Sequence, residues 1–289
     1  MFSESRIKLQ AKGAMSFNNN WGKSIAITII MLCIYSVLNS FNIIAQHIFN
    51  VTMSLQSIAD SYLDPYFYFQ LIDHFVLQVY MYLFIFLVAC ILLWVLIVWP
   101  LSLGIRYWCY DVANNTSPSI SVIFRYFSCK NLYLKAISFK FNLFLRCFFR
   151  FVVCLLPAVI MFFIVGELTI FSNISALSRT NIFLLYLSVL FLFICGLLAF
   201  GLIILRFFLA SYFFILDDHI SGIKCIDESY KKMKGKCFGL VRLLITFIPW
   251  MLSCFFILPI LYVYPYLQIS LANFAKWLMY DIAQSKQQS

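Results

Sequence analysis

The sequence predicts an all-α fold: a polytopic transmembrane helical bundle with five to six spans and cytoplasmic amphipathic surface helices. Hydrophobic residues make up 64% of the 289 residues and charged residues only 11%, whereas soluble domains are about 45–50% apolar and about 25% charged. The apolar residues also come in long blocks, each able to cross a hydrocarbon core of about 30 Å. Together these observations exclude a water-soluble fold with a large core.

The apolar blocks define the predicted spans in chain order. We expect spans at residues 24–48, 75–104, 143–165, 181–206 and 238–261, and a last apolar segment at 262–280 that either crosses again or lies in the interface. Residues 1–23 form a basic cytoplasmic leader, residues 24–282 a single transmembrane domain, and residues 283–289 a polar tail. The first apolar run is too long for the apolar region of a signal peptide, so we expect it to remain as a membrane helix.

The basic residues alternate between loops and therefore predict an orientation. Four Lys or Arg residues precede the first span, none lies at 49–74, seven lie at 105–150 and seven at 206–242. Cytoplasmic loops of membrane proteins carry an excess of Lys and Arg. The sequence thus predicts a multi-pass protein of the cell (plasma) membrane with its amino terminus in the cytoplasm. The net charge of +10 is explained by this topology, and nucleic acid is not an expected partner.

Three basic, half-apolar segments precede predicted spans, at residues 7–21, 120–134 and 226–240. In the last of them, apolar residues recur at spacings of three and four with lysines between them, which is typical of a helix that lies on a membrane surface. Two interpretations stay open. The chain repeats a surface helix followed by a membrane helix, or these segments are ordinary basic flanks of cytoplasmic loops.

The candidate contacts to anionic lipid are basic residues of the cytoplasmic regions: Lys140, Arg146, Arg150, Lys231, Lys232, Lys234 and Lys236. Arg146 and Arg150 are one helical turn apart and share a face, and each basic residue near an anionic surface contributes about 1 kcal/mol. Asp217 and Asp218 follow the fourth apolar block. We expect them to pair with the lysines or to cap the next helix; the alternative is a carboxylate pair that shares a proton or binds a cation.

Neither enzymatic motifs nor metal-binding patterns stand out. The sequence contains no His-Glu-x-x-His, no phosphate-binding glycine loop and no Gly-x-Ser-x-Gly. His47 and His74 flank a loop that holds Asp60, Asp64 and Asp73, but their irregular spacing favours a solvated acidic loop over a metal site. The ten cysteines occur singly, as small buried hydrophobic residues do. We therefore predict no enzyme, no cofactor and no metal.

Several short stretches resemble a known family. They are Ala11–Gly13, Asn20–Gly22, Ala210–Tyr212, Asp217–Asp218, Glu228–Lys236, Phe247–Trp250, Pro265–Tyr266 and Ala272–Phe274. These stretches resemble the domain-of-unknown-function 975 family of bacterial integral membrane proteins, although Pro249 stands where that family usually has Gly. The resemblance implies a multi-pass helical membrane protein. It brings no activity and no catalytic residues.

Two classes of function fit these patterns. The first is a non-enzymatic protein that organises lipid, or an accessory or scaffold component of a membrane complex; its partners are membrane lipids and, in the accessory case, another membrane protein complex. The second is a permease for a small or amphipathic substrate. Pro157, Pro249 and Pro259 interrupt the predicted spans, and interrupted helices often line substrate sites in transporters.

Overall fold

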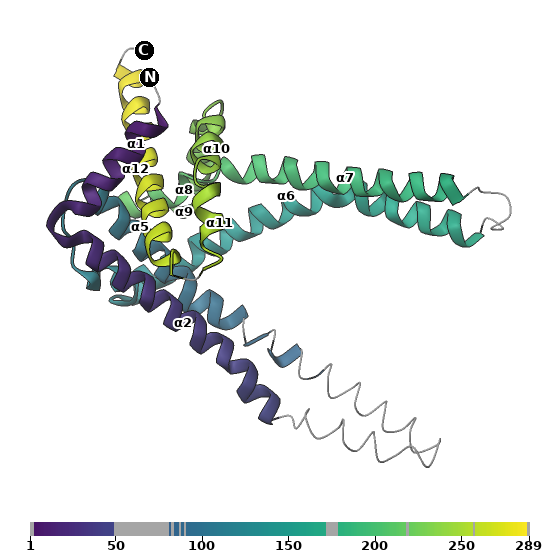
Figure 1. The fold of residues 1–289 in the computed structure, drawn as a ribbon, viewed down its shortest axis with the longest axis horizontal. Helices are drawn as coiled ribbons and strands as arrows, with labels where there is room; N and C mark the ends of the chain where they lie inside the picture. Colours follow the sequence, from purple (N-terminus) through teal and green to yellow (C-terminus); the bar gives the residue numbers. More distant parts are fainter. Residues whose placement is uncertain are drawn as a thin grey trace.

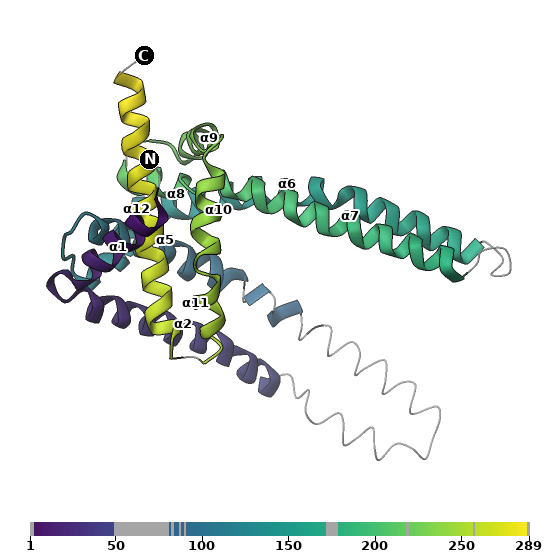
Figure 2. The ribbon, with the colours of Figure 1, turned by 45° about the horizontal axis from the view of Figure 1, so that its top comes forward.

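A computed structural model describes residues 3–48, 81, 84–86, 88–89, 91–171, 179–217, 220–256 and 258–287. Every regular element in these ranges is a helix, which confirms the all-α class. The chain begins with α1 (Glu4–Ser16), η1 (Phe17–Asn19) and α2 (Asn20–Ile48), and returns through η2 (Trp94–Val98), a π-helical stretch, and α5 (Trp99–Ala113). α2 and the described residues before α5 leave the rest of the molecule in the same direction (Figures 1 and 2).

The corner between α1 and α2 is built from asparagines. Asn18 and Asn19 have φ angles of 43° and 57°, in the left-handed region that Asn tolerates better than most residues. The side-chain amide of the buried Asn20 then donates hydrogen bonds to the carbonyl oxygens of Ala14 and Thr116, each at 3.0 Å. The corner is thereby attached to the loop that follows α5.

The second pair of long helices forms the arm that extends to the right in Figure 1. It follows η3 (Ile120–Phe127) and consists of α6 (Lys130–Phe171) and α7 (Arg179–Leu205), which pack along each other. Helix α6 continues through Pro157. The prediction that this proline breaks the span is therefore wrong, because the neighbouring turns of a membrane helix can accommodate the missing hydrogen bond.

The third unit contains α8 (Ala210–Leu216), α9 (Gly222–Lys232), α10 (Cys237–Ile245), α11 (Ile248–Ser253) and α12 (Ile260–Gln287). The segment predicted as one span at 238–261 is two short helices, α10 and α11, and Pro249 lies in the first turn of α11. A proline is favoured at that position because its N–H would have no partner there. α12 runs beside α10 and α11 (Figures 1 and 2).

The core lies at the end of the molecule from which the long pairs depart. Trp108 of α5, Ile123 of η3, Tyr212 of α8 and Phe274 of α12 are fully or almost fully buried there. Gly104 lets η3 cross α5 at close range, since a Cβ atom at this position would lie 1.9 Å from the carbonyl oxygen of Ile123. The core thus joins elements from all three units.

The three segments predicted as surface helices are helical, but their apolar faces are covered by protein. Ile226, Met233 and Leu240 of the lysine-rich segment are buried, and so are Ala11 and Met15 of α1. The lysine-rich segment is also divided in two by a turn at residues 233–236. The apolar stripe that the spacing assigned to the membrane surface therefore packs into the core. The elements α1 and η3 each precede a long apolar helix, α2 and α6, whereas α9 is followed by the short helices α10 and α11, so a threefold repeat of surface helix and membrane helix is not shown.

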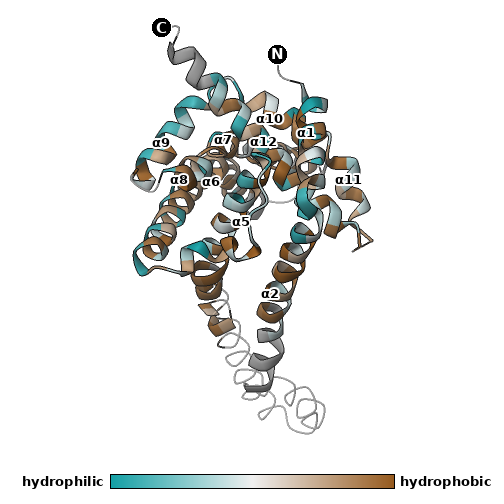
Figure 3. Ribbon diagram, turned by 90° about the vertical axis from the view of Figure 1, so that its left-hand side faces the viewer, coloured by the Kyte–Doolittle hydropathy of each residue, from teal (hydrophilic) through white to brown (hydrophobic). Residues whose placement is uncertain are grey.

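Four helical stretches among the described residues are long and apolar enough to cross a membrane: Glu4–Leu38, Phe84–Ala113, Lys130–Glu167 and Phe183–Leu216. They overlap the first four predicted spans. The two later segments, 238–261 and 262–280, are not among them. In Figure 3 the apolar colour dominates α2, whereas hydrophilic residues gather on α9 and toward the chain ends.

The packing of α6 on α7 depends on Gly196 and yields a testable prediction. A Cβ atom at Gly196 would lie 2.6 Å from the carbonyl oxygen of Cys154, whereas one at Gly201 would meet nothing within 4 Å. Gly196→Ala should therefore force the helices apart and lower the free energy of unfolding by about 1–3 kcal/mol. Gly201→Ala is the matched control and should be neutral or slightly stabilising. Thermal unfolding of both variants in detergent measures the difference, and equal midpoints would contradict the packing described here.

Candidate functional site

A cavity of about 420 Å³ opens where α2, α5, α6 and α12 meet. Its walls combine two cationic groups with hydroxyl, amide and apolar side chains. The lining residues are Met31 and Tyr35 of α2; Val98 of η2; Trp99, Ser102, Ile105 and Arg106 of α5; Lys140, Leu143, Phe144 and Cys147 of α6; and Tyr264 and Gln268 of α12. We call this cavity the cationic pocket.

Helical spacing brings these side chains to one place. Ser102 and Arg106 are four residues apart on α5, and Tyr264 and Gln268 are four apart on α12, so each pair shares a helix face. The lining residues of α6 follow Lys140 at intervals of three, four and seven, which again selects one face. The pocket therefore receives a pair of polar side chains from α5 and from α12, and one cation with a mostly apolar face from α6.

Arg106 and Lys140 face this space without a counter-ion in the part of the chain that the structure describes. The lining residues include no Asp or Glu, and neither cation makes a hydrogen bond or an ion pair with a described residue. Two like charges at one site raise each other's energy, and an opposite charge within about 4–6 Å relieves that cost. The arrangement therefore favours an anion between the two side chains.

The depth of the pocket follows from helical rise. The ammonium group of Lys276 on α12 donates to the carbonyl oxygen of Ala113, at the end of α5, at 3.2 Å. Arg106 precedes Ala113 by seven residues and Gln268 precedes Lys276 by eight, which is about 10–12 Å along each helix at about 1.5 Å per residue. Arg106 and Gln268 thus lie about two helical turns below the polar ends of α5 and α12.

Lys140 is the only one of the three predicted α6 cations that lines the pocket. Arg146 forms an ion pair with Asp227 of α9. The guanidinium of Arg150 stacks over the rings of Phe207, at 4.4 Å, and Tyr230, at 4.7 Å. Arg146 and Arg150 share a face, as predicted, and their contacts are with α9 and the turn after α7; neither of them lines the pocket.

The lysines around α9 do not form one cluster either. Lys232 pairs with Glu228 at 2.7 Å, one helical turn away. Lys236 pairs with Asp281 of α12, and its ammonium group lies 5.8 Å from the ring centre of Trp277. Lys231 and Lys234 are exposed. Two of these four cations are therefore already matched by carboxylates within the chain.

The predicted Asp217–Asp218 pair is described only at Asp217. Asp217 follows the last residue of α8, and its backbone N–H donates to the carbonyl oxygen of Phe213. The residue at the N-cap of α9 is Ser221, so the prediction that Asp217 caps this helix is wrong. Asp218 lies outside the described residues, as do His74 and the side chain of His47.

Sequence reasoning did not single out Arg106 as a member of the site. Ser102 and Arg106 share a helix face in the sequence, but only the tertiary packing of α12 against α5 adds Tyr264 and Gln268. Within the described ranges, no group of three His, Cys, Asp or Glu side chains could hold a metal ion.

Comparisons with known proteins add no identity. No protein-family model matches the chain, and no match was found among curated proteins or solved structures. The function must therefore be inferred from the geometry of the site.

The ion pair between Arg146 and Asp227 predicts a pH effect on stability. The hydrogen bond from Arg146 lowers the pKa of the Asp227 carboxyl group in the folded protein. A carboxyl group with a lowered folded-state pKa stabilises the protein above its unfolded-state pKa, near 3.9, and loses this contribution as the pH falls through the folded-state pKa. Because the pair is largely exposed, Asp227→Asn should cost at most about 1 kcal/mol at pH 7.

Unfolding midpoints of the native protein and of Asp227→Asn, taken from pH 7 down to pH 3, test this prediction. The difference between the two proteins should shrink steadily below about pH 4. Arg146→Gln serves as the partner variant and should show the same pH profile. A difference that stays constant to pH 3 would show that Asp227 acts through something other than its charge.

Proposed function

We propose that this chain is a non-enzymatic membrane protein that binds the anionic headgroup of a lipid in the cationic pocket, and thereby organises lipid or fixes its own position within a larger membrane complex. The observation that carries the proposal is the pairing of Arg106 and Lys140 in a cavity whose described lining has no carboxylate. A phosphate group between them would accept hydrogen bonds from both cations. Such charge-assisted bonds are stronger than neutral ones.

The remaining lining suits a lipid better than a small polar ion. Ser102, Tyr264 and Gln268 supply hydrogen-bonding groups beside the cations, whereas Leu143 and Phe144 supply apolar surface. Phe144 is itself exposed on the outside of α6, where acyl chains would lie. The lining thus changes from polar to apolar across the pocket, as a phospholipid does from headgroup to chain.

For the orientation, we propose that the amino terminus and the polar ends of the helices face the cytoplasm and that the membrane is the plasma membrane. The basic leader and the basic loops support this side. Membership of the domain-of-unknown-function 975 family is likewise a proposal, carried by the resemblance of the stretches quoted above.

A permease for a small or amphipathic anion is the second candidate. The π-helical stretch η2 ends at Val98, which lines the pocket, and π-helical turns are frequent at functional sites. The break between α10 and α11 does not contribute lining residues. The lipid hypothesis is favoured because the pocket combines its cations with an apolar side.

Binding of anionic lipid to pocket variants tests the proposal. In nanodiscs that contain phosphatidylglycerol in phosphatidylcholine, Arg106→Gln and Lys140→Gln should each weaken retention of phosphatidylglycerol by at least about tenfold, because one lost charge-assisted hydrogen bond costs about 1.5–3 kcal/mol. Lys231→Gln, which changes an exposed lysine outside the pocket, is the control and should retain the lipid. Native mass spectrometry of the released protein counts the bound lipids.

The same variants distinguish the two candidates. Inorganic phosphate at millimolar concentration should not displace the lipid if the acyl chains contribute to binding. Uptake of labelled phosphate into proteoliposomes that is lost in Arg106→Gln would favour the permease. Equal lipid retention by the native protein, both pocket variants and Lys231→Gln would contradict lipid binding at this pocket.

A further inference from the structure

The last apolar region of the chain folds back on itself. No charged residue occurs between Arg242 and Lys276, a stretch that the structure divides into two arms: α10 with α11, and the first part of α12. The arms lie side by side in Figures 1 and 2, and the connection between them occupies residues 254–259. The observations that define this hairpin hold whether or not the cationic pocket binds a lipid.

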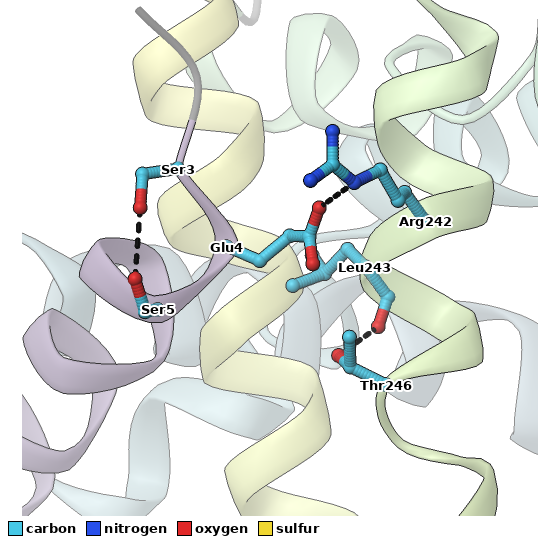
Figure 4. A network of polar contacts seen from close by, with 6 residues as sticks. All are labelled: Ser3, Glu4, Ser5, Arg242, Leu243 and Thr246. Carbon is cyan, nitrogen blue, oxygen red and sulfur yellow. Dashed lines mark hydrogen bonds and ion pairs between the residues drawn. The ribbon is translucent and has the colours of Figure 1, made fainter.

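Both arms start from the polar end of the core. Arg242 in α10 forms an ion pair with Glu4 of α1 (Figure 4). Lys276 in α12 bonds to the carbonyl oxygen of Ala113. These contacts place the base of each arm at the level where α1 begins and α5 ends, next to the basic elements of the chain.

The arms are short compared with a bilayer. From Arg242 to Phe256 the chain advances 14 residues, which is about 21 Å even for an unbroken helix. From Leu258 to Lys276 it advances 18 residues, or about 27 Å. A full crossing of the hydrocarbon core requires about 30 Å and about 20 residues, so an arm that starts at the polar interface ends inside the apolar region.

The tip is strongly apolar and exposed. The side chains of Phe255, Phe256 and Leu258 are 89%, 75% and 78% exposed. A tip that emerged on the far side would hold these side chains in water. The connection between α6 and α7, in contrast, has the polar sequence Ser-Asn-Ile-Ser-Ala-Leu-Ser at residues 172–178.

Backbone amides near the tip are hydrogen-bonded within the chain, as an apolar environment requires. The amides of Cys254, Phe255 and Phe256 donate to carbonyl oxygens three residues earlier, at 3.1–3.3 Å. On the other side of the tip, Leu261 and Tyr262 do the same at 3.2 and 3.0 Å. In lipid an unpaired backbone group costs several kcal/mol, and these turns pair the amides of these five residues without water.

We propose that α10, α11 and the first half of α12 form a re-entrant hairpin, whose tip at Phe255, Phe256 and Leu258 lies among lipid acyl chains and whose two arms enter and leave the membrane on the same side. The partner of this exposed apolar surface is thus the interior of the bilayer. The protein then crosses the membrane four times, with the long helices of the first two units, and inserts its third unit only part of the way.

Cysteine labelling from each side of sealed vesicles tests the proposal. In a chain whose native cysteines are replaced, Phe256→Cys is compared with Lys231→Cys, on exposed α9, and Arg179→Cys, at the start of α7 and the far end of its arm. With a membrane-impermeant maleimide, Lys231→Cys and Arg179→Cys should react from opposite sides. Phe256→Cys should react from neither side, at least tenfold more slowly than both, until detergent is added.

Either alternative position would overturn the proposal. Reaction of Phe256→Cys from the Arg179 side, at a similar rate, would show a complete crossing. Reaction from the Lys231 side, at a similar rate, would show a hairpin that lies outside the membrane.

A second comparison needs no cysteine replacement. Phe238, near the base of α10, is as exposed as Phe256, at 75%, so the two positions differ in depth and not in burial by protein. Phe256→Asp should lower the yield of folded, membrane-inserted protein several-fold more than Phe238→Asp, because a carboxylate is costly in the hydrocarbon region. Equal yields would place the tip in water and contradict the re-entrant hairpin.

Discussion

The burial of α12 at the polar end of the molecule is the interaction on which the arrangement of the helices depends. Its residues Ile269, Ala272, Ala275 and Leu278 are fully buried, and α12 contacts α1, α2 and α5. The paired α6 and α7, in contrast, expose large apolar side chains along most of their length. The core therefore holds the helix pairs together at one end, and the arms that extend from it are long and apolar enough to cross a membrane.

Polar contacts near this core show that the basic leader, residues 1–23, also has a structural role. The ammonium group of Lys8 donates to the carbonyl oxygen of Thr246, just past the end of α10, and lies 4.5 Å from the ring centre of Phe247. The hydroxyl group of Tyr266 donates to the carbonyl oxygen of Lys8. A cation at a helix carboxyl end also interacts favourably with the helix dipole. The basic leader thus fixes the third unit against the first, in addition to its predicted effect on orientation.

Sequence periodicity and length were sufficient for the helical class and for the first four apolar helices, because these properties depend only on local composition. They failed at residues 238–261, where Pro249 begins a new helix and the apolar run turns back. Periodicity and length also do not show whether lipid or protein covers an apolar stripe of a helix. Ile226 and Met233 have the spacing of a surface helix, yet protein covers them, and spacing is the same whether the neighbour is lipid or another helix.

The same limit applies to the site. Lys140 and Arg106 both belong to the basic region at residues 105–150, so composition alone does not separate them. The place of Arg106 in the pocket depends on α12 packing beside α5 from more than 150 residues away in the chain, which no local pattern shows. Arg146 and Arg150 were correctly placed on one face of α6. Arg146 pairs with Asp227, and Arg150 stacks on Phe207 and Tyr230. Both contacts depend on where α9 and the turn after α7 fold back.

The two proposals meet on α12 and constrain each other. Gln268 and Tyr264 line the cationic pocket, and both belong to the arm that, as a re-entrant segment, returns to the side from which it entered. A pocket with such a wall opens to one leaflet only, the leaflet at the polar ends of the helices. With the basic loops in the cytoplasm, the headgroup bound by Arg106 and Lys140 would belong to a lipid of the cytoplasmic leaflet, where anionic lipids attract basic segments. Transport across the membrane would require the pocket to open to the opposite side as well. An arm of α12 that ends inside the bilayer does not reach that side and so cannot line a route to it.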